Sequence, residues 1–170
     1  MEIQTISGAL FDELARRAAS SARGRMHYNL HSEYGDPCQR LLNAIGVNSF
    51  IPPHRHVGKY AAEVLVALRG KLVVVVFDDG GEILRLIRLD CSAGAASSDC
   101  CVGVELPPAT WHTVIALVDG SVLMELKAGP FDPAAPKELA KWAPSEGTPA
   151  ATAYHSSLLG KVAVYESSMS

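Results

Sequence analysis

The amino-acid sequence predicts a mainly β fold, a single small barrel or sandwich with a helix before it. Short apolar or alternating segments follow one another from residue 25 to about residue 127, and turn residues separate them at intervals of roughly 8–12 residues. The chain has 170 residues, enough for one hydrophobic core. We therefore expect one domain: an N-terminal helical segment (residues 1–24), a barrel (residues 25–130) and a C-terminal helix and extension (residues 131–170).

The helix is expected over residues 7–22. Ser7 is a suitable N-cap, and Leu10, Leu14 and Ala18 recur at a spacing of four, which places them on one helical face. Gly24 follows and is expected to end the helix.

Eight segments have the length and pattern of strands. They are residues 25–30, 39–45, 49–56, 63–77 with a bend at Gly70, 82–89, 101–106, 111–118 and 121–127. Asp79-Gly80-Gly81 and Asp119-Gly120 are expected to form hairpin turns. Beyond the barrel, residues 137–142 predict a short helix. After Gly147 we expect a surface extension with a strand at residues 161–165.

Composition excludes several classes of function. Charged residues make up 19% of the chain and the net charge is −3, with no basic excess of the kind that nucleic-acid binding requires. No apolar stretch reaches the roughly 20 residues of a membrane helix, and no leader pattern is visible. The expectation is a soluble cytoplasmic protein that contacts neither nucleic acid nor membrane.

Three histidines and a glutamate form the main chemical signal. His54 and His56 lie two residues apart, so on a strand both imidazoles share one face and can bind one ion. Glu63 opens an apolar strand, where a carboxylate is either a metal ligand or a solvated strand end. His112 follows a Pro-containing turn, and is either a third histidine ligand or a hydrogen-bonded core residue.

Together these residues resemble the two motifs of the cupin superfamily. HRHVGKYAAEVLVALRG is similar to the first motif, in which Gly70 has the position of the final glycine. Residues 107–112 are similar to the second motif, P-x-G-x-x-H, with Ala109 in the glycine position. The gap between His56 and Glu63 is longer than usual, and Ala116 stands where an asparagine is common. The resemblance implies a cupin-type β-barrel, or jelly roll, in which His54, His56, Glu63 and His112 bind one metal ion.

A second resemblance covers most of the chain. RGRMHYNLH, QRLLNAI, PHRH, ELKAGPF and WAPSEG are similar to segments of the WbuC family of cupin-fold metalloproteins. Some members of that family are encoded with genes of surface-polysaccharide biosynthesis. This resemblance suggests a sugar or nucleotide-sugar as the ligand and leaves the reaction open.

Several polar residues are candidates for substrate binding. In the segment 25–31, alternate positions carry polar side chains, which form either a solvated edge or a wall of the pocket above the metal. Arginine there can hold a phosphate or carboxylate in bidentate fashion. Glu125 and Lys127 share a strand face, where they either pair at the surface or line the pocket. The candidates are Arg25, His27, Asn29, Gln39, Arg40 and Glu125.

These residues support more than one function. The ligand set suits one divalent transition metal, Fe, Mn, Ni, Co, Cu or Zn. The favoured hypothesis is a metal-dependent isomerase, epimerase, lyase or oxygenase that acts on a small anionic molecule, with no catalytic residue yet assigned. The alternatives are a metal-assisted binding or sensing module without turnover and a protein with a structural metal. A homodimer is expected, because barrel edges need covering.

Overall fold

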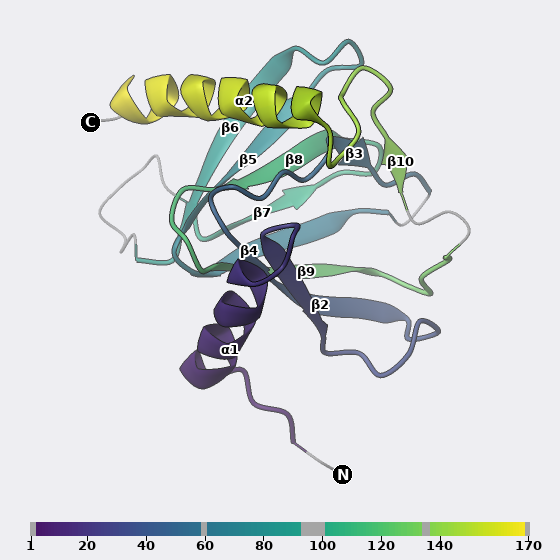
Figure 1. Cartoon of the computed structure of the whole chain (residues 1–170). Helices are drawn as coiled ribbons and strands as arrows, with labels where there is room; N and C mark the ends of the chain where they lie inside the picture. The colour runs from purple at the N-terminus through teal and green to yellow at the C-terminus, as the bar shows by residue number, and fades with distance from the viewer. Residues whose placement is uncertain (1–2, 59–60, 93–100, 134–136, 169–170) are drawn as a thin grey trace.

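Two five-stranded antiparallel sheets form the body of the protein. The computed structural model describes residues 3–58, 61–92, 101–133 and 137–168 (Figure 1). In spatial order, the first sheet contains β1 (Arg25–Asn29), β2 (Cys38–Ile45), β9 (Ser121–Ala128), β4 (Glu63–Arg69) and β7 (Gly103–Leu106). The second contains β10 (Glu138–Leu139), β3 (His54–Arg55), β8 (Trp111–Ala116), β5 (Lys71–Phe77) and β6 (Ile83–Asp90). From β2 to β10 the chain passes from one sheet to the other at each step except between β5 and β6, an alternation typical of a jelly roll.

The main core lies between the sheets. Along β4, burial alternates, so Glu63, Leu65 and Ala67 share the buried face. Side chains from both sheets meet there, among them Ile45, Leu65, Leu72, Val74, Leu89, Val114 and Leu123. An isolated parallel bridge from Leu89 to Cys101 links the end of β6 to the segment before β7, so the sheets are connected there without forming a strictly closed barrel.

Glycines occupy the predicted bend and turns. Gly70 has a φ of +73° between β4 and β5, where a side chain would collide with Ser121. Gly81, with a φ of +92°, lies in the predicted hairpin turn between β5 and β6. The second predicted hairpin is not formed: Gly120, with a φ of +71°, lies in a turn that joins β8 of the second sheet to β9 of the first. These backbone conformations favour glycine.

The helix α1 (Gly8–Ala19) covers the outer face of the first sheet. As predicted, Ser7 is its N-cap, and the Ser7 hydroxyl accepts a hydrogen bond from the backbone N–H of Leu10. Leu14 and Ala18 are buried against the sheet. Met26 and Tyr28 of β1 pack in the same cluster, so Arg25, His27 and Asn29 point to the opposite face of the sheet.

The C-terminal region differs from the prediction. Residues 161–165 are not a strand but part of α2 (Pro149–Ser168), which packs on the outer face of the second sheet (Figure 1). Residues 137–142 are not a helix: they contain β10 and a turn. Hydrogen bonds to β3 determine this outcome, with Glu138 opposite Arg55 and Leu139 opposite His54. The predicted strand at 49–56 is shortened to β3, because Pro52 and Pro53 carry no backbone N–H.

Two valines on α2 provide a matched test of this packing. Val162 is 1% exposed and Val164 is 73% exposed. We expect Val162→Ala to lower the free energy of unfolding by about 2 kcal/mol, because it removes buried methyl groups and leaves a cavity. Val164→Ala is expected to change it by less than about 0.5 kcal/mol. Chemical denaturation followed by circular dichroism measures both, and equal losses would contradict the placement of α2.

Candidate metal centre

His54 and His112 lie opposite each other on neighbouring strands. They are the paired residues of β3 and β8, and their ring centroids are 4.5 Å apart. The Nδ1 atom of His54 lies 2.9 Å from the Pro52 carbonyl oxygen, and that of His112 lies 3.0 Å from the Thr110 carbonyl oxygen. Each Nδ1 must therefore carry the proton, which leaves each Nε2 with a free lone pair, the form that binds metals.

His56 completes a cluster of three imidazoles. The ligand atoms of His54, His56 and His112 lie within 4.8 Å of one another. Burial, together with the charge of Lys137, holds the pKa of His54 well below its usual value. Burial and the charge of Lys127 lower the pKa of His56 to about 4. Both rings are therefore neutral at physiological pH and available to a cation.

Glu63 faces two of these histidines from the first sheet. Its Oε2 lies 3.1 Å from Nε2 of His112, and its Oε1 lies 3.6 Å from Nε2 of His56. Oε2 is buried and has no hydrogen-bond partner among the described residues. Burial raises the pKa of Glu63, which the contact with His112 opposes. A carboxylate oxygen in contact with an imidazole lone pair requires a proton or a metal ion between them, so the buried ligand set fits a metal.

Ala109 occupies a backbone conformation that favours glycine. Its φ is +64°, and its N–H donates a hydrogen bond of 2.8 Å to the carbonyl of His56, which joins the two histidine motifs. We expect Ala109→Gly to raise the free energy of unfolding by about 0.5 kcal/mol. Glycine removes the steric strain of the left-handed conformation, and this gain exceeds the extra conformational entropy that glycine loses on folding. Ala116→Gly in β8 should instead lower it by about 1 kcal/mol. Urea denaturation compares them, and a loss of stability in Ala109→Gly would contradict this interpretation.

A row of polar side chains crosses the inner face of the first sheet next to the cluster. Lys127 Nζ lies 2.6 Å from Oε1 of Glu125, and Asn43 Nδ2 donates a 3.1 Å hydrogen bond to Oε2 of the same residue. His27 is paired with Asn43 across β1 and β2. Burial alone would raise the pKa of Glu125, but the Lys127 charge and hydrogen bonds with Glu63 and Lys127 lower it to about 2. Glu125 also forms a second potential metal-binding group with His56 and Glu63.

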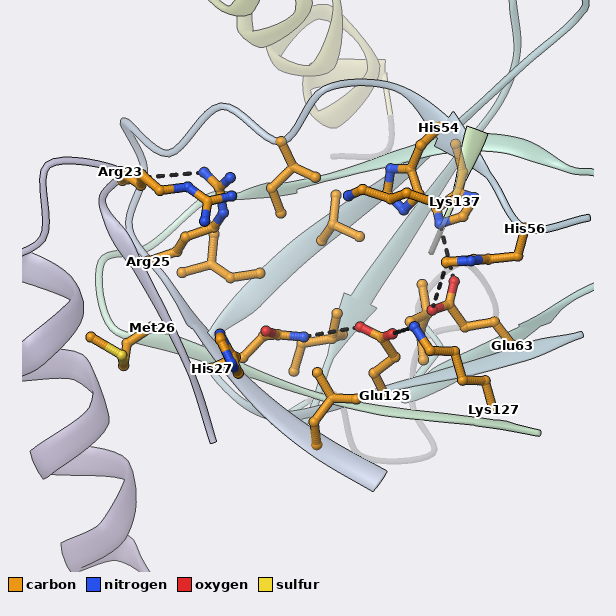
Figure 2. Close-up of a pocket in the computed structure, with 18 of the residues that line it drawn as sticks. Arg23, Arg25, Met26, His27, His54, His56, Glu63, Glu125, Lys127 and Lys137 are labelled. Carbon is orange, nitrogen blue, oxygen red and sulfur yellow. Dashed lines mark hydrogen bonds and ion pairs between the residues drawn. The ribbon is translucent and has the colours of Figure 1, made fainter. Parts of the chain in front are cut away.

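The cluster lies at one end of a cavity of about 610 Å³. Figure 2 shows His54, His56 and Glu63 at that end and Arg23 and Arg25 at the other, with Glu125 between them. At the arginine end, Glu146 Oε1 lies 3.2 Å from Nε of Arg23 and 2.6 Å from Nη1 of Arg25. Aliphatic side chains complete the lining: Leu41, Ile45, Ile51, Leu65, Val114 and Leu123.

Lys137 also lines the cavity and lies directly before β10. Figure 2 places it beside His54 and His56. Its neighbour Glu138 accepts a 2.8 Å hydrogen bond from Nε of Arg55, which fixes β10 to β3. Burial lowers the pKa of Lys137, and the Glu125 carboxylate opposes this, although part of the residue remains exposed to solvent.

The structure separates the predicted substrate-binding residues into two groups. Arg25, His27 and Glu125 line the cavity, as does Lys127. Asn29 is exposed on β1 and does not line it. The other two predicted residues, Gln39 and Arg40, also lie outside the lining and stabilise the neighbouring loop.

In that loop, the side-chain amide of Gln39 donates to the carbonyls of Tyr34 and Asp36. Arg40 pairs with Asp36 at 2.6 Å. Both side chains therefore already have partners in the fold.

Four charged or polar residues of the site were not predicted. Arg23 lies before β1, outside the alternating segment. Lys137 was missed because it lies beside β10, which has only two residues and gives no strand pattern. Asn43 lies in a strand that was predicted, but a lone asparagine carries no motif. Glu146 belongs to a turn before α2, and its proximity to Arg25 depends on the tertiary fold.

Among the described residues, no helix combines the length and apolarity needed to cross a membrane.

A family model described as a domain of unknown function (DUF6016) matches residues 6–89. No curated protein matches the sequence of this chain.

Comparison with solved structures finds proteins similar to this chain. A protein of Shewanella oneidensis is 12% identical, with a TM-score of 0.55 over 70% of this chain and 75% of that chain. A cupin 2 conserved barrel domain protein from Rhodopseudomonas palustris is 14% identical, with a TM-score of 0.47 over 68% of this chain and 66% of that chain. KdgF from Halomonas is 17% identical, with a TM-score of 0.44 over 61% of this chain and 79% of that chain.

At these identities the similarity concerns the fold alone. The two-sheet topology and the convergence of the histidine motifs between the sheets agree with the sequence prediction. The chain has the cupin-type fold, with a histidine and glutamate cluster inside it that could hold a metal ion.

Proposed function

We propose that the protein is a metal-dependent enzyme that acts on a small anionic molecule, a sugar or nucleotide-sugar, and that it belongs to the WbuC family. The observation that carries this proposal is a single cavity with a metal-binding cluster at one end and two arginines at the other. A bound divalent ion supplies a Lewis acid that polarises a carbonyl or hydroxyl oxygen. The reaction is of the isomerase, epimerase, lyase or oxygenase type.

The charge of the cavity favours an anion. Arg23, Arg25, Lys127 and Lys137 outnumber the carboxylates of Glu63, Glu125 and the paired Glu146 by one. A divalent metal ion adds two further positive charges. An anionic ligand is therefore attracted to the cavity and neutralises part of this excess.

The two walls of the cavity suit a sugar-like molecule. The first sheet contributes His27, Asn43 and Glu125, which can hydrogen-bond hydroxyl groups. Aliphatic side chains such as Ile51 and Val114 can pack against the apolar face of a sugar ring. Because Asn43 and Lys127 hold Glu125 in place, this wall is fixed before a ligand binds.

The test is turnover of sugar acids, sugar phosphates and nucleotide-sugars, followed by NMR. We expect the metal-loaded protein to consume at least one of these compounds, and both chelator-treated protein and His54→Ala to lose this activity. If a compound binds but is recovered unchanged, the protein is a binding module and not an enzyme. Turnover that persists in His54→Ala would overturn the metal-dependent mechanism.

A further inference from the structure

Lys137 differs from the other cations of the cavity in its lack of a partner. Arg23 and Arg25 pair with Glu146, and Lys127 pairs with Glu125. Within the described ranges, no hydrogen bond or ion pair involves the ammonium of Lys137. The side chain lines the cavity near the metal-binding histidines, so a ligand is the natural source of its counter-charge.

The fold fixes the backbone next to Lys137. The strand β10, which begins at the following residue, pairs with β3 in a defined register, with Leu139 opposite His54. A hydrogen bond from the Ala140 N–H to the Pro53 carbonyl, 2.9 Å long, continues this pairing. The backbone beside the lysine is thus joined directly to the strand that carries His54, which brings the side chain into the cavity near the histidine cluster.

Arg25 offers a second, separate point of attachment. Its Nη1 donates to the Phe50 carbonyl at 3.0 Å and lies 2.6 Å from Oε1 of Glu146. Within the part of the chain that the structure describes, Nε and Nη2 make no such contact. The guanidinium is therefore anchored by one nitrogen, while the other two remain available to a carboxylate or phosphate.

We propose that the ligand is a dianion whose two acidic groups lie at opposite ends of the molecule, one held by Lys137 beside the metal and the other by Arg25. This inference rests on the proposed function, since it concerns the same cavity. It narrows the substrate class from any small anion to a molecule with an acidic group at each end, such as a sugar diacid or a phosphorylated sugar acid.

The experiment uses dicarboxylates of increasing length to test how far apart the two anion-binding groups lie. The probes are the straight-chain dicarboxylates from succinate to pimelate, each compared with the monocarboxylate of the same carbon number. Binding to Co²⁺-loaded protein is measured by calorimetry, and the visible Co²⁺ spectrum reports contact with the metal. We expect one chain length to bind about tenfold more tightly than its monocarboxylate, because it gains a second charge-assisted hydrogen bond.

Variants identify the residues responsible. Lys137→Gln should abolish the preference for the dicarboxylate, and Lys137→Arg should restore most of it. Lys141→Gln removes an exposed lysine four residues away and should keep the preference. Protein that binds Co²⁺ normally but shows no preference, or a preference that survives in Lys137→Gln, overturns this inference alone. Failure to bind Co²⁺ overturns the proposed function instead.

Discussion

Replacement of His112 by alanine is expected to weaken metal binding at least about a hundredfold. Four ligands share a binding free energy that in structural zinc sites is about 10–16 kcal/mol, so the loss of one imidazole removes a sizeable part. His112 has a central position, because it faces His54 across the strand pair and contacts Glu63 at 3.1 Å. Titration of metal-free protein with Zn²⁺ against a competing chelator measures the change.

Two other histidines serve as controls. His27 lines the same cavity but lies outside the cluster. His155 is a buried residue of α2, and its Nε2 lies 2.9 Å from the Val47 carbonyl oxygen. Neither His27→Ala nor His155→Ala should change Zn²⁺ affinity by more than a few fold. If His112→Ala binds Zn²⁺ as tightly as wild type, or if all three variants weaken it equally, the assignment of the site is wrong.

Replacement of Glu63 by glutamine is expected to have opposite effects on metal affinity and on the stability of the metal-free protein. Affinity should fall at least about a hundredfold, because the charged ligand is lost and even outer-shell changes cost 10–100-fold. The free energy of unfolding without metal should rise by about 1 kcal/mol. The amide of the introduced glutamine can donate a hydrogen bond to the Nε2 lone pair of His112. The buried Oε2 of Glu63 is an acceptor and repels that lone pair.

Glu125→Gln is the matched control for this carboxylate. Glu125 belongs to the group with His56 and Glu63, but it already accepts hydrogen bonds from Asn43 and Lys127. Its replacement should lower Zn²⁺ affinity by no more than about tenfold and should not stabilise the metal-free protein. A larger effect on affinity from Glu125→Gln than from Glu63→Gln would make Glu125 the carboxylate ligand.

The cluster of histidines and Glu63 could be predicted from sequence because residue spacing, a turn and a strand start indicate the position of its members. The spacing of two in His54-Arg55-His56 predicted that both imidazoles reach one ion, and their ligand atoms do lie together although β3 ends at Arg55. A Pro-containing turn precedes His112. Glu63 begins β4 with its side chain on the buried face. The long gap between His56 and Glu63 does not keep Glu63 away from the histidines. Glu63 belongs to β4, which pairs with β9 and not with β3.

The C-terminal helix was missed although its signals are present. Thr148 precedes Pro149, a favourable pair for a helix start, and the Thr148 hydroxyl accepts from the N–H of Ala151 at 3.1 Å. The buried positions Ala151, His155, Leu158 and Val162 recur at spacings of four and three. The abundance of serine and alanine between them concealed this pattern.

The positively charged part of the cavity depends on tertiary structure and could be predicted only in part. Arg25 and His27 of the alternating segment 25–31 line the cavity, but Asn29, at the end of β1, is exposed and lies outside the lining. Lys137 lies just before the two-residue strand β10, and Glu146 belongs to a turn. No local pattern specifies such contacts, because distant backbone segments create them.

The central claim is that the cavity holds a metal ion, and elemental analysis of protein purified without added metal tests it most directly. Beside the wild type, the double variant His54→Ala/His112→Ala serves as the reference, with folding checked by circular dichroism. This account predicts about one transition-metal ion per wild-type chain, by analogy with single-ion sites of this ligand set, and none in the variant. Wild-type protein that contains no metal and binds no divalent ion on titration would contradict it.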